Sequence, residues 1–196
     1  MDSQPLMRQL AFLVEADRLK GVLRQTDIAS GARRENSAEH SWHLALMASV
    51  LTAYAAEPVD LLKVLRMLLI HDVIEIDDGD TFAFDEAANA TKQAREERAA
   101  DRLFGMLPPG QDAEFRALWD EFEAGTTAES RYANALDRLQ PLLLNAENGG
   151  GSWKHNGIRR SQVLQRMDPI RTALPEVWPA VMAVVDWACA EQHILA

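Results

Sequence analysis

The chain has 196 residues, and its 20 basic and 30 acidic residues give it a formal net charge of −10. Its hydrophobic fraction of 47% excludes a largely disordered protein, and the negative charge disfavours a nucleic-acid partner because the phosphates would repel it. The length is typical of a single domain, here 1–196. The only cysteine, Cys189, excludes an internal disulfide and is typical of a protein from a reducing compartment.

No segment has the pattern of a targeting signal or a membrane span. The first ten residues lack a long apolar run, and the apolar stretch 174–190 is interrupted by Glu176 and Asp186. We therefore expect a cytoplasmic protein without a membrane partner.

Hydrophobic spacing predicts helices almost throughout the chain and no strands or hairpins. The polar segment 24–35 is expected to be a loop. Asn36 and Glu39 then fit a capping box that opens a helix ending near residue 56, and Asp60 fits the N-cap of the next helix. The other expected elements are helices at 6–19, 61–76 (strongly apolar), 85–106, 112–124, 127–146, 159–171 and 175–193, and a flexible glycine loop at 148–151.

The apolar helix expected at 61–76 contains an anomaly, since ionisable groups are costly in a core unless they are paired or bind a metal. Its apolar run ends with His71 and Asp72, and Glu75 follows. Spacings of three and four residues place these side chains toward one side of a helix. Glu75 is able to transfer a proton there as a general base or acid.

Two more segments supply groups of the same kind. The helix after Asn36 carries His40 and His43 three residues apart, and Asp137 lies inside the apolar run 132–144. Two histidines and two carboxylates would form a mixed nitrogen and oxygen site, which suits a divalent transition ion better than calcium. Such an ion lowers the pKa of bound water and polarises a phosphoryl oxygen.

Each of these residues also has an ordinary structural interpretation. A histidine such as His43 is more often a packing or surface group than a ligand, and Asp80 can belong to an acidic helix stop. Asp137 can pair with Arg131 or Arg138 instead of a metal. The residues by themselves therefore leave both interpretations open.

Three stretches carry a resemblance to a known family. In chain order they are 35–42 (ENSAEHSW), 71–81 (HDVIEIDDGDT) and 134–139 (NALDRL). They resemble the motifs of HD-domain metal-dependent phosphohydrolases, and most of all those of the 5'-deoxynucleotidase-like branch. The resemblance implies an all-α fold, a single HD-domain helical bundle with its motif core over about 19–160 and C-terminal helices at 158–196 packing on it.

The same resemblance implies roles for individual residues. It implies one divalent ion, which Mn, Co, Fe, Ni, Zn or Mg could supply, bound by four ligands: His40, His71, Asp72 and Asp137. It also implies that Glu75 is the catalytic carboxylate and that Asp72 and Asp80 position water or substrate.

Basic residues near the first motif match positions that contact the substrate phosphate. They are Arg24 and Arg33, and a guanidinium fork suits a phosphate dianion. One departure is Gln25, which stands where characterised bacterial relatives have a tryptophan that shapes the sugar pocket, so deoxyribose selectivity is left open. The segment 151–157 has no assigned role, and its Trp153 either covers the pocket or packs inside the fold.

The expected function is a phosphomonoesterase that releases phosphate from (deoxy)nucleoside 5'-monophosphates. Another phosphate ester, cyclic or pyrophosphorylated, is the first alternative. The alarmone hydrolases of that group usually carry adjacent Glu-Asp, whereas Ile76 here separates Glu75 from Asp77. A catalytically silent nucleotide-sensing module is the second alternative, and the retained ligands argue against it. The resemblance is also compatible with a homodimer.

Overall fold

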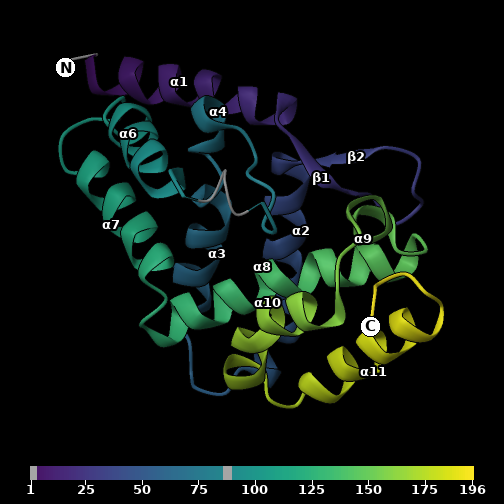
Figure 1. Ribbon diagram of the computed structural model, residues 1–196. Coiled ribbons are helices and arrows are strands. Elements are labelled where there is room, and N and C mark those ends of the chain that lie inside the picture. Colours follow the sequence, from purple (N-terminus) through teal and green to yellow (C-terminus); the bar gives the residue numbers. More distant parts are fainter. Residues whose placement is uncertain (1–3, 86–89) are drawn as a thin grey trace.

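The computed structural model describes residues 4–85 and 90–196. Helices make up most of this part of the chain and pack around a hydrophobic core (Figure 1). In chain order the α-helices are α1 (Gln4–Ala16), α2 (Ser37–Leu51), α3 (Leu61–Ile70), α4 (Glu75–Asp78), α6 (Lys92–Phe104), α7 (Gln111–Ala124), α8 (Ala128–Glu147), α9 (Gly151–Asn156), α10 (Arg160–Ala173) and α11 (Trp178–Ala190). Short 3-10 helices, η1 (Asp17–Gly21) and η2 (Thr52–Tyr54), follow α1 and α2. The all-α prediction is confirmed, and no described helix has both the length and the apolar character that crossing a bilayer requires.

A short antiparallel hairpin precedes α2. Its strands are β1 (Leu23–Asp27) and β2 (Arg34–Asn36). Their register places Leu23 opposite Asn36. The prediction of a loop at 24–35, with no strands, was therefore wrong. Polar strands of five and three residues carry too little alternation of apolar and polar side chains to be recognised from sequence.

The hairpin leads directly into α2 through the predicted capping box, which is confirmed. Asn36 Oδ1 accepts a hydrogen bond from Glu39 N at 2.9 Å, and Glu39 Oε2 accepts one from Asn36 N at 3.3 Å. These bonds satisfy N–H groups that the start of a helix leaves without partners. Because His40 follows immediately in the first turns of α2, the cap also helps to set its position.

The apolar helix predicted at 61–76 is divided in two, which corrects that prediction. Asp60 caps its start as expected, and α3 then ends at Ile70. Hydrogen bonds between residues three apart close a tight turn after α3, including the one from Glu75 N to Asp72 O at 3.0 Å. The chain continues as α4, so the His-Asp pair lies in a turn between two helices.

The later helices lie close to their predicted bounds, with α7, α8, α10 and α11 confirmed to within a few residues. The glycine loop predicted at 148–151 is shorter than expected, because α9 begins at Gly151. The helix predicted at 85–106 is described as α6 from Lys92 onward, and residues 86–89 lie outside the described residues.

Helix α8 lies at the centre of the fold, since it contacts α2, α3, α7, α10 and α11 (Figure 1). Its Leu136 and Tyr132 are almost fully buried, and Tyr132 Oη donates a hydrogen bond to Ala48 O of α2 at 2.9 Å. This packing brings the first turns of α2, the turn after α3 and the middle of α8 toward one another. The predicted functional residues lie on these three segments.

The capping residue offers a local test of the fold. Asn36→Ala should lower the free energy of unfolding by about 1 kcal/mol, because Glu39 N–H then loses its acceptor. Asn36→Ser keeps an acceptor oxygen and should stay close to the wild type. Urea unfolding measures both variants, and equal losses for alanine and serine would contradict the capping role.

Candidate metal centre

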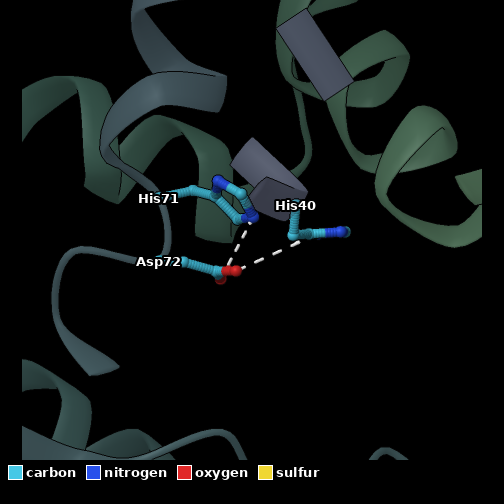
Figure 2. Close-up of side chains that lie close together, drawn as sticks. All are labelled: His40, His71 and Asp72. Atoms are coloured by element: carbon cyan, nitrogen blue, oxygen red, sulfur yellow. Dashed lines mark ion pairs between the residues drawn. The ribbon is translucent and has the colours of Figure 1, made fainter. Parts of the chain in front are cut away.

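Four of the predicted residues meet where α2, the turn after α3 and α8 come together. His40 lies near the start of α2, His71 and Asp72 follow α3, and Asp137 lies in the middle of α8. Figure 2 shows the first three close together, with Asp72 paired to both imidazoles. The side chains are largely buried, with an exposed fraction that runs from 0% for His40 to 14% for Asp137.

The separations of the ligand atoms match those expected around one ion. His40 Nε2 lies 3.0 Å from Asp137 Oδ1 and 3.9 Å from Asp72 Oδ2. His71 Nε2 lies 3.1 Å from Asp72 Oδ1 and 4.0 Å from Asp137 Oδ1. In an octahedral shell, ligands at about 2.1 Å from the metal are about 3 Å apart when adjacent and about 4 Å apart when opposite. His40, His71 and Asp72 each offer one possible ligand atom within 4.8 Å of the others, and Asp137 Oδ1 lies next to both imidazoles, so the cluster is a candidate site for one divalent ion.

The protonation of His71 suits a metal ligand. Its Nδ1 lies 2.9 Å from Leu68 O, which assigns the proton to Nδ1 and leaves the lone pair on Nε2, beside Asp72. That buried Nε2 has no hydrogen-bond partner in the described part of the chain. Burial lowers the pKa of the ring, so it stays neutral near neutral pH. A buried nitrogen without a partner is costly, and a bound metal would remove that cost.

His40 is oriented by a residue that the sequence analysis missed. Gln140 Nε2 donates to Glu35 Oε1 at 2.6 Å, so Gln140 Oε1 is the atom that accepts from His40 Nδ1 at 3.1 Å. This bond leaves His40 Nε2 facing Asp137. The spacing could have indicated Gln140, because it stands three residues after Asp137 and so lies near the same face of α8. Burial disfavours the charged ring, but the carboxylates of Asp137 and Glu35 outweigh it and raise the pKa of His40 to about 9.

The two carboxylate oxygens of Asp137 face different groups: one faces the imidazoles and the other faces two arginines. Oδ1 faces the imidazoles, whereas Oδ2 accepts a hydrogen bond from Arg138 Nη1 at 3.1 Å and lies 3.8 Å from Arg166 Nη2. Burial by itself would raise the pKa of Asp137, but His40 and Arg138 lower it well below its usual range. The carboxylate is therefore ionised, as a metal ligand must be.

Two further carboxylates stand beside the ligands. Glu75 Oε2 accepts a hydrogen bond from Ser37 Oγ at 2.6 Å, and burial together with the nearby Asp72 raises the pKa of Glu75 well above its usual value. Asp80 Oδ2 accepts a hydrogen bond from Gln25 N at 3.1 Å, and burial raises the pKa of Asp80 as well. Glu75 is thus suited to hold a proton that it can pass to a reacting group.

A cavity opens onto this cluster. Its lining residues include Arg24, Gln25, Asp72, Glu75, Asp80, Phe82, Phe84, Lys92, Asp137, Arg138, Asn145, Ser152 and Arg166. Arg24 is only 12% exposed at its side chain and donates to Asp72 Oδ2 at 2.8 Å. Lys92 and Arg166 were not predicted from the sequence, and Arg138 was predicted only as a possible partner of Asp137.

Neither Arg33 nor Trp153 is among the described residues that line this cavity. Arg33 makes two hydrogen bonds to Glu39, at 2.8 and 2.7 Å, and its side chain is 54% exposed. The structure therefore does not bring Arg33 together with the other predicted residues. Trp153 is 3% exposed and belongs to the hydrophobic core, which decides between the two roles left open for it.

Comparisons with known proteins place the chain in a family. A model of the HD domain matches residues 16–178. The 5'-deoxynucleotidase HDDC2 of Bos taurus is 30% identical over 139 residues, which cover 70% of this chain and 66% of that protein. The protein of the same name from Homo sapiens is 29% identical over 139 residues, covering 70% and 67%. This chain thus spans about two thirds of the length of these relatives, and it belongs to the HD domain family.

Solved structures agree with this assignment. A protein from Magnetospirillum magnetotacticum MS-1, described as a predicted metal-dependent phosphohydrolase, is 50% identical, with a TM-score of 0.94 over 98% of this chain and 97% of that chain. A conserved hypothetical protein from Pyrococcus furiosus shares the fold, at 22% identity and a TM-score of 0.59 over 88% and 99% of the two chains. The resemblance to HD-domain metal-dependent phosphohydrolases and to their 5'-deoxynucleotidase-like branch is confirmed.

The hydrogen bond from His40 to Gln140 can be tested through metal affinity. Gln140→Ala should weaken the binding of Mn²⁺ by about 10- to 100-fold, because the imidazole loses the acceptor that fixes its orientation. His155→Ala, which removes an exposed histidine, is the matched control and should bind as the wild type does. Isothermal titration measures both, and an unchanged affinity in Gln140→Ala would refute the orienting role.

Lys92, which lines the cavity, forms an ion pair with a buried carboxylate. Lys92 Nζ reaches Glu96 Oε1 at 3.3 Å, and Glu96 is only 7% exposed. Burial raises the pKa of Glu96 to about 7, against the opposing effect of Lys92. The folded protein therefore binds a proton at Glu96 more tightly than the unfolded chain does.

This proton predicts a pH dependence of stability. Below about pH 4.5, the ordinary pKa of a glutamate, the raised pKa of Glu96 contributes fully to the stability of the fold. This stabilisation is lost as the pH rises through about 7. Glutamine does not titrate, so the Glu96→Gln variant does not lose this stabilisation as the pH rises. Its free energy of unfolding relative to the wild type should therefore increase between low and neutral pH, by at most about 3 kcal/mol. Urea unfolding at about pH 5 and about pH 8 measures the difference, with the exposed Glu97→Gln as the control. A Glu96→Gln difference that does not change with pH would contradict the shift.

Proposed function

We propose that this protein is a metal-dependent phosphohydrolase that releases phosphate from (deoxy)nucleoside 5'-monophosphates. The observation that carries the proposal is the buried cluster of His40, His71 and Asp72, whose possible ligand atoms lie within 4.8 Å of one another. Asp137 Oδ1 adjoins both imidazoles, and the two aspartates line a cavity. When bound, a divalent ion supplies a water of lowered pKa and positive charge for the phosphoryl oxygens.

The relatives support the choice of substrate. The curated proteins from Bos taurus and Homo sapiens are both 5'-deoxynucleotidases, and the 50% identical structure is described as a predicted metal-dependent phosphohydrolase. The proposal is supported by the two imidazoles, since His40 and His71 each lie within 4.0 Å of both Asp72 and Asp137. An ester of phosphate is therefore the class of substrate that both the donor set and the family favour.

We assign proton transfer to Glu75. Ser37 Oγ holds one carboxyl oxygen in place, and the raised pKa keeps a proton available on the group. We propose that Glu75 donates this proton to the leaving 5'-oxygen as the P–O bond breaks. The proton released by the attacking water then restores Glu75, so that the acid is unchanged at the end of the reaction.

The neighbouring charged groups position the reactants. Asp72, held by Arg24, and Asp80, held by Gln25 N, are assigned to orient the water and the substrate. Arg24 lies within 3.9 Å of Asp80 as well as close to Asp72, so its charge offsets carboxylates that would otherwise repel a phosphate dianion.

The sugar preference, a homodimer and a cytoplasmic location remain predictions. Gln25 lines the cavity at the position that the family uses to shape its sugar pocket, so phosphate release from dAMP and from AMP should be compared directly. Light scattering tests the homodimer. Cyclic and pyrophosphorylated nucleotides belong in the same substrate screen, because preferential hydrolysis of either would favour the alternative substrate class.

The catalytic role of Glu75 gives the central test of activity. Glu75→Gln keeps the shape and the hydrogen-bonding capacity of the side chain but cannot transfer the proton, so kcat should fall by about 10²- to 10⁴-fold. Its metal content should equal that of the wild type, because the four ligands are intact. A phosphate-release assay with metal analysis measures both quantities.

The exposed Glu147→Gln, at the end of α8, is the matched control and should leave kcat unchanged. Turnover by Glu75→Gln at the wild-type rate would remove Glu75 from the mechanism. Metal-loaded wild-type protein that binds nucleotides but never releases phosphate would instead favour the silent module.

A further inference from the structure

The cavity is lined by four cationic side chains, and three of them are already held by carboxylates. Arg24 Nη1 lies 2.8 Å from Asp72 Oδ2, Arg138 Nη1 lies 3.1 Å from Asp137 Oδ2, and Lys92 Nζ lies 3.3 Å from Glu96 Oε1. The fourth is Arg166 of α10. Its one carboxylate within 4.0 Å among the described residues is Asp137, at 3.8 Å. In the same part of the chain its guanidinium makes no hydrogen bond, so all of its donors remain available.

Arg166 is placed beside the centre by the packing of α10 on α8. Val163, Met167 and Ile170 form the buried face of α10, and Arg166 stands next to that face. The guanidinium approaches Asp137 Oδ2, the oxygen that points away from the imidazoles. The carboxylate of Asp137 therefore lies between the Arg166 guanidinium and the imidazoles of the candidate metal centre.

Arg166 is also accessible from outside. Together with Arg138 it lines both the main cavity and an adjoining hollow that includes Gln162, Gln165 and Phe84. The side chain of Arg166 is 37% exposed, in contrast to 12% for Arg24. An anion entering the cavity thus meets Arg166 without displacing a buried ion pair.

We propose that Arg166 binds the phosphate group of the substrate, in the role that the sequence analysis expected of Arg33. This inference rests on the proposed function and adds a recognition residue to it. The planar guanidinium presents paired N–H donors that match two oxygens of a phosphate dianion. Arg33 is held by Glu39 at the surface, and Arg24 is held by Asp72, so Arg166 is the arginine whose fork is open to the ligand.

A merely structural role makes a different prediction. If Arg166 served only to balance the charge of Asp137, its loss would change the affinity for the metal and not the affinity for phosphate at saturating metal. The two quantities can be measured separately, because inorganic phosphate, the product of the reaction, can be titrated into protein already loaded with Mn²⁺.

The experiment compares Arg166→Ala, Arg166→Lys and, as a matched control, Arg171→Ala, which removes an exposed arginine from the same helix. In Arg166→Ala the affinity of the Mn²⁺-loaded protein for inorganic phosphate should fall by about 10- to 100-fold, and KM for a nucleoside 5'-monophosphate should rise by a similar factor. Arg166→Lys keeps the charge but not the fork and should lie between Arg166→Ala and the wild type. Arg171→Ala should match the wild type, and Mn²⁺ affinity should be unchanged in all three variants.

The proposal is overturned if Arg166→Ala binds phosphate and substrate as the wild type does. It is also overturned if the loss of phosphate binding is explained by a matching loss of Mn²⁺ affinity. Failure of the proposed function is a separate result, in which the wild type hydrolyses no nucleoside monophosphate. In that case the phosphate titration still decides whether Arg166 holds the anion, and Arg166→Lys supplies the answer should the alanine variant not fold.

Discussion

The structure depends on the electrostatic balance of a buried site in which two imidazoles and several carboxylates lie within a few ångströms of one another. Unpaired charges in a protein core are costly, so each of these groups needs a partner. Arg24 and Arg138 offset part of the negative charge of Asp72 and Asp137. The imidazole Nε2 of His71 is left without a hydrogen bond in the described part of the chain, and a divalent cation would pair with it and with both carboxylates.

Each imidazole of the candidate metal centre is oriented by a second residue. His71 is fixed by the carbonyl of Leu68 in the preceding helix, α3, and His40 is fixed by Gln140 of α8, which in turn donates to Glu35 of β2. The small hairpin also provides Arg24, and the backbone N–H that holds Asp80. The short sheet thus brings polar groups of β1 and β2 to the candidate metal centre.

Local patterns in the sequence indicated some of these groups, and the resemblance to the HD-domain family supplied the full set of candidate ligands. The capping box is visible in two residues, and His71 and Asp72 are conspicuous because they end an apolar run. The hairpin was missed because its strands are short and polar, with too little alternation to be recognised. Arg166 was missed for a different reason: it reaches Asp137 only through the packing of α10 on α8, which no local pattern reports. Arg33 lies near the motif in the chain, yet it pairs with Glu39 at the surface.

Anomalous X-ray diffraction from crystals soaked in Mn²⁺ tests the central claim most directly, since it locates the ion without reference to any activity. We expect one strong peak between α2, the turn after α3 and α8. His40 Nε2, His71 Nε2 and oxygens of Asp72 and Asp137 should each lie within about 2.0–2.3 Å of it. The absence of a peak there at saturating Mn²⁺, or a peak bound by other side chains, would contradict the assignment of this cluster as the metal centre.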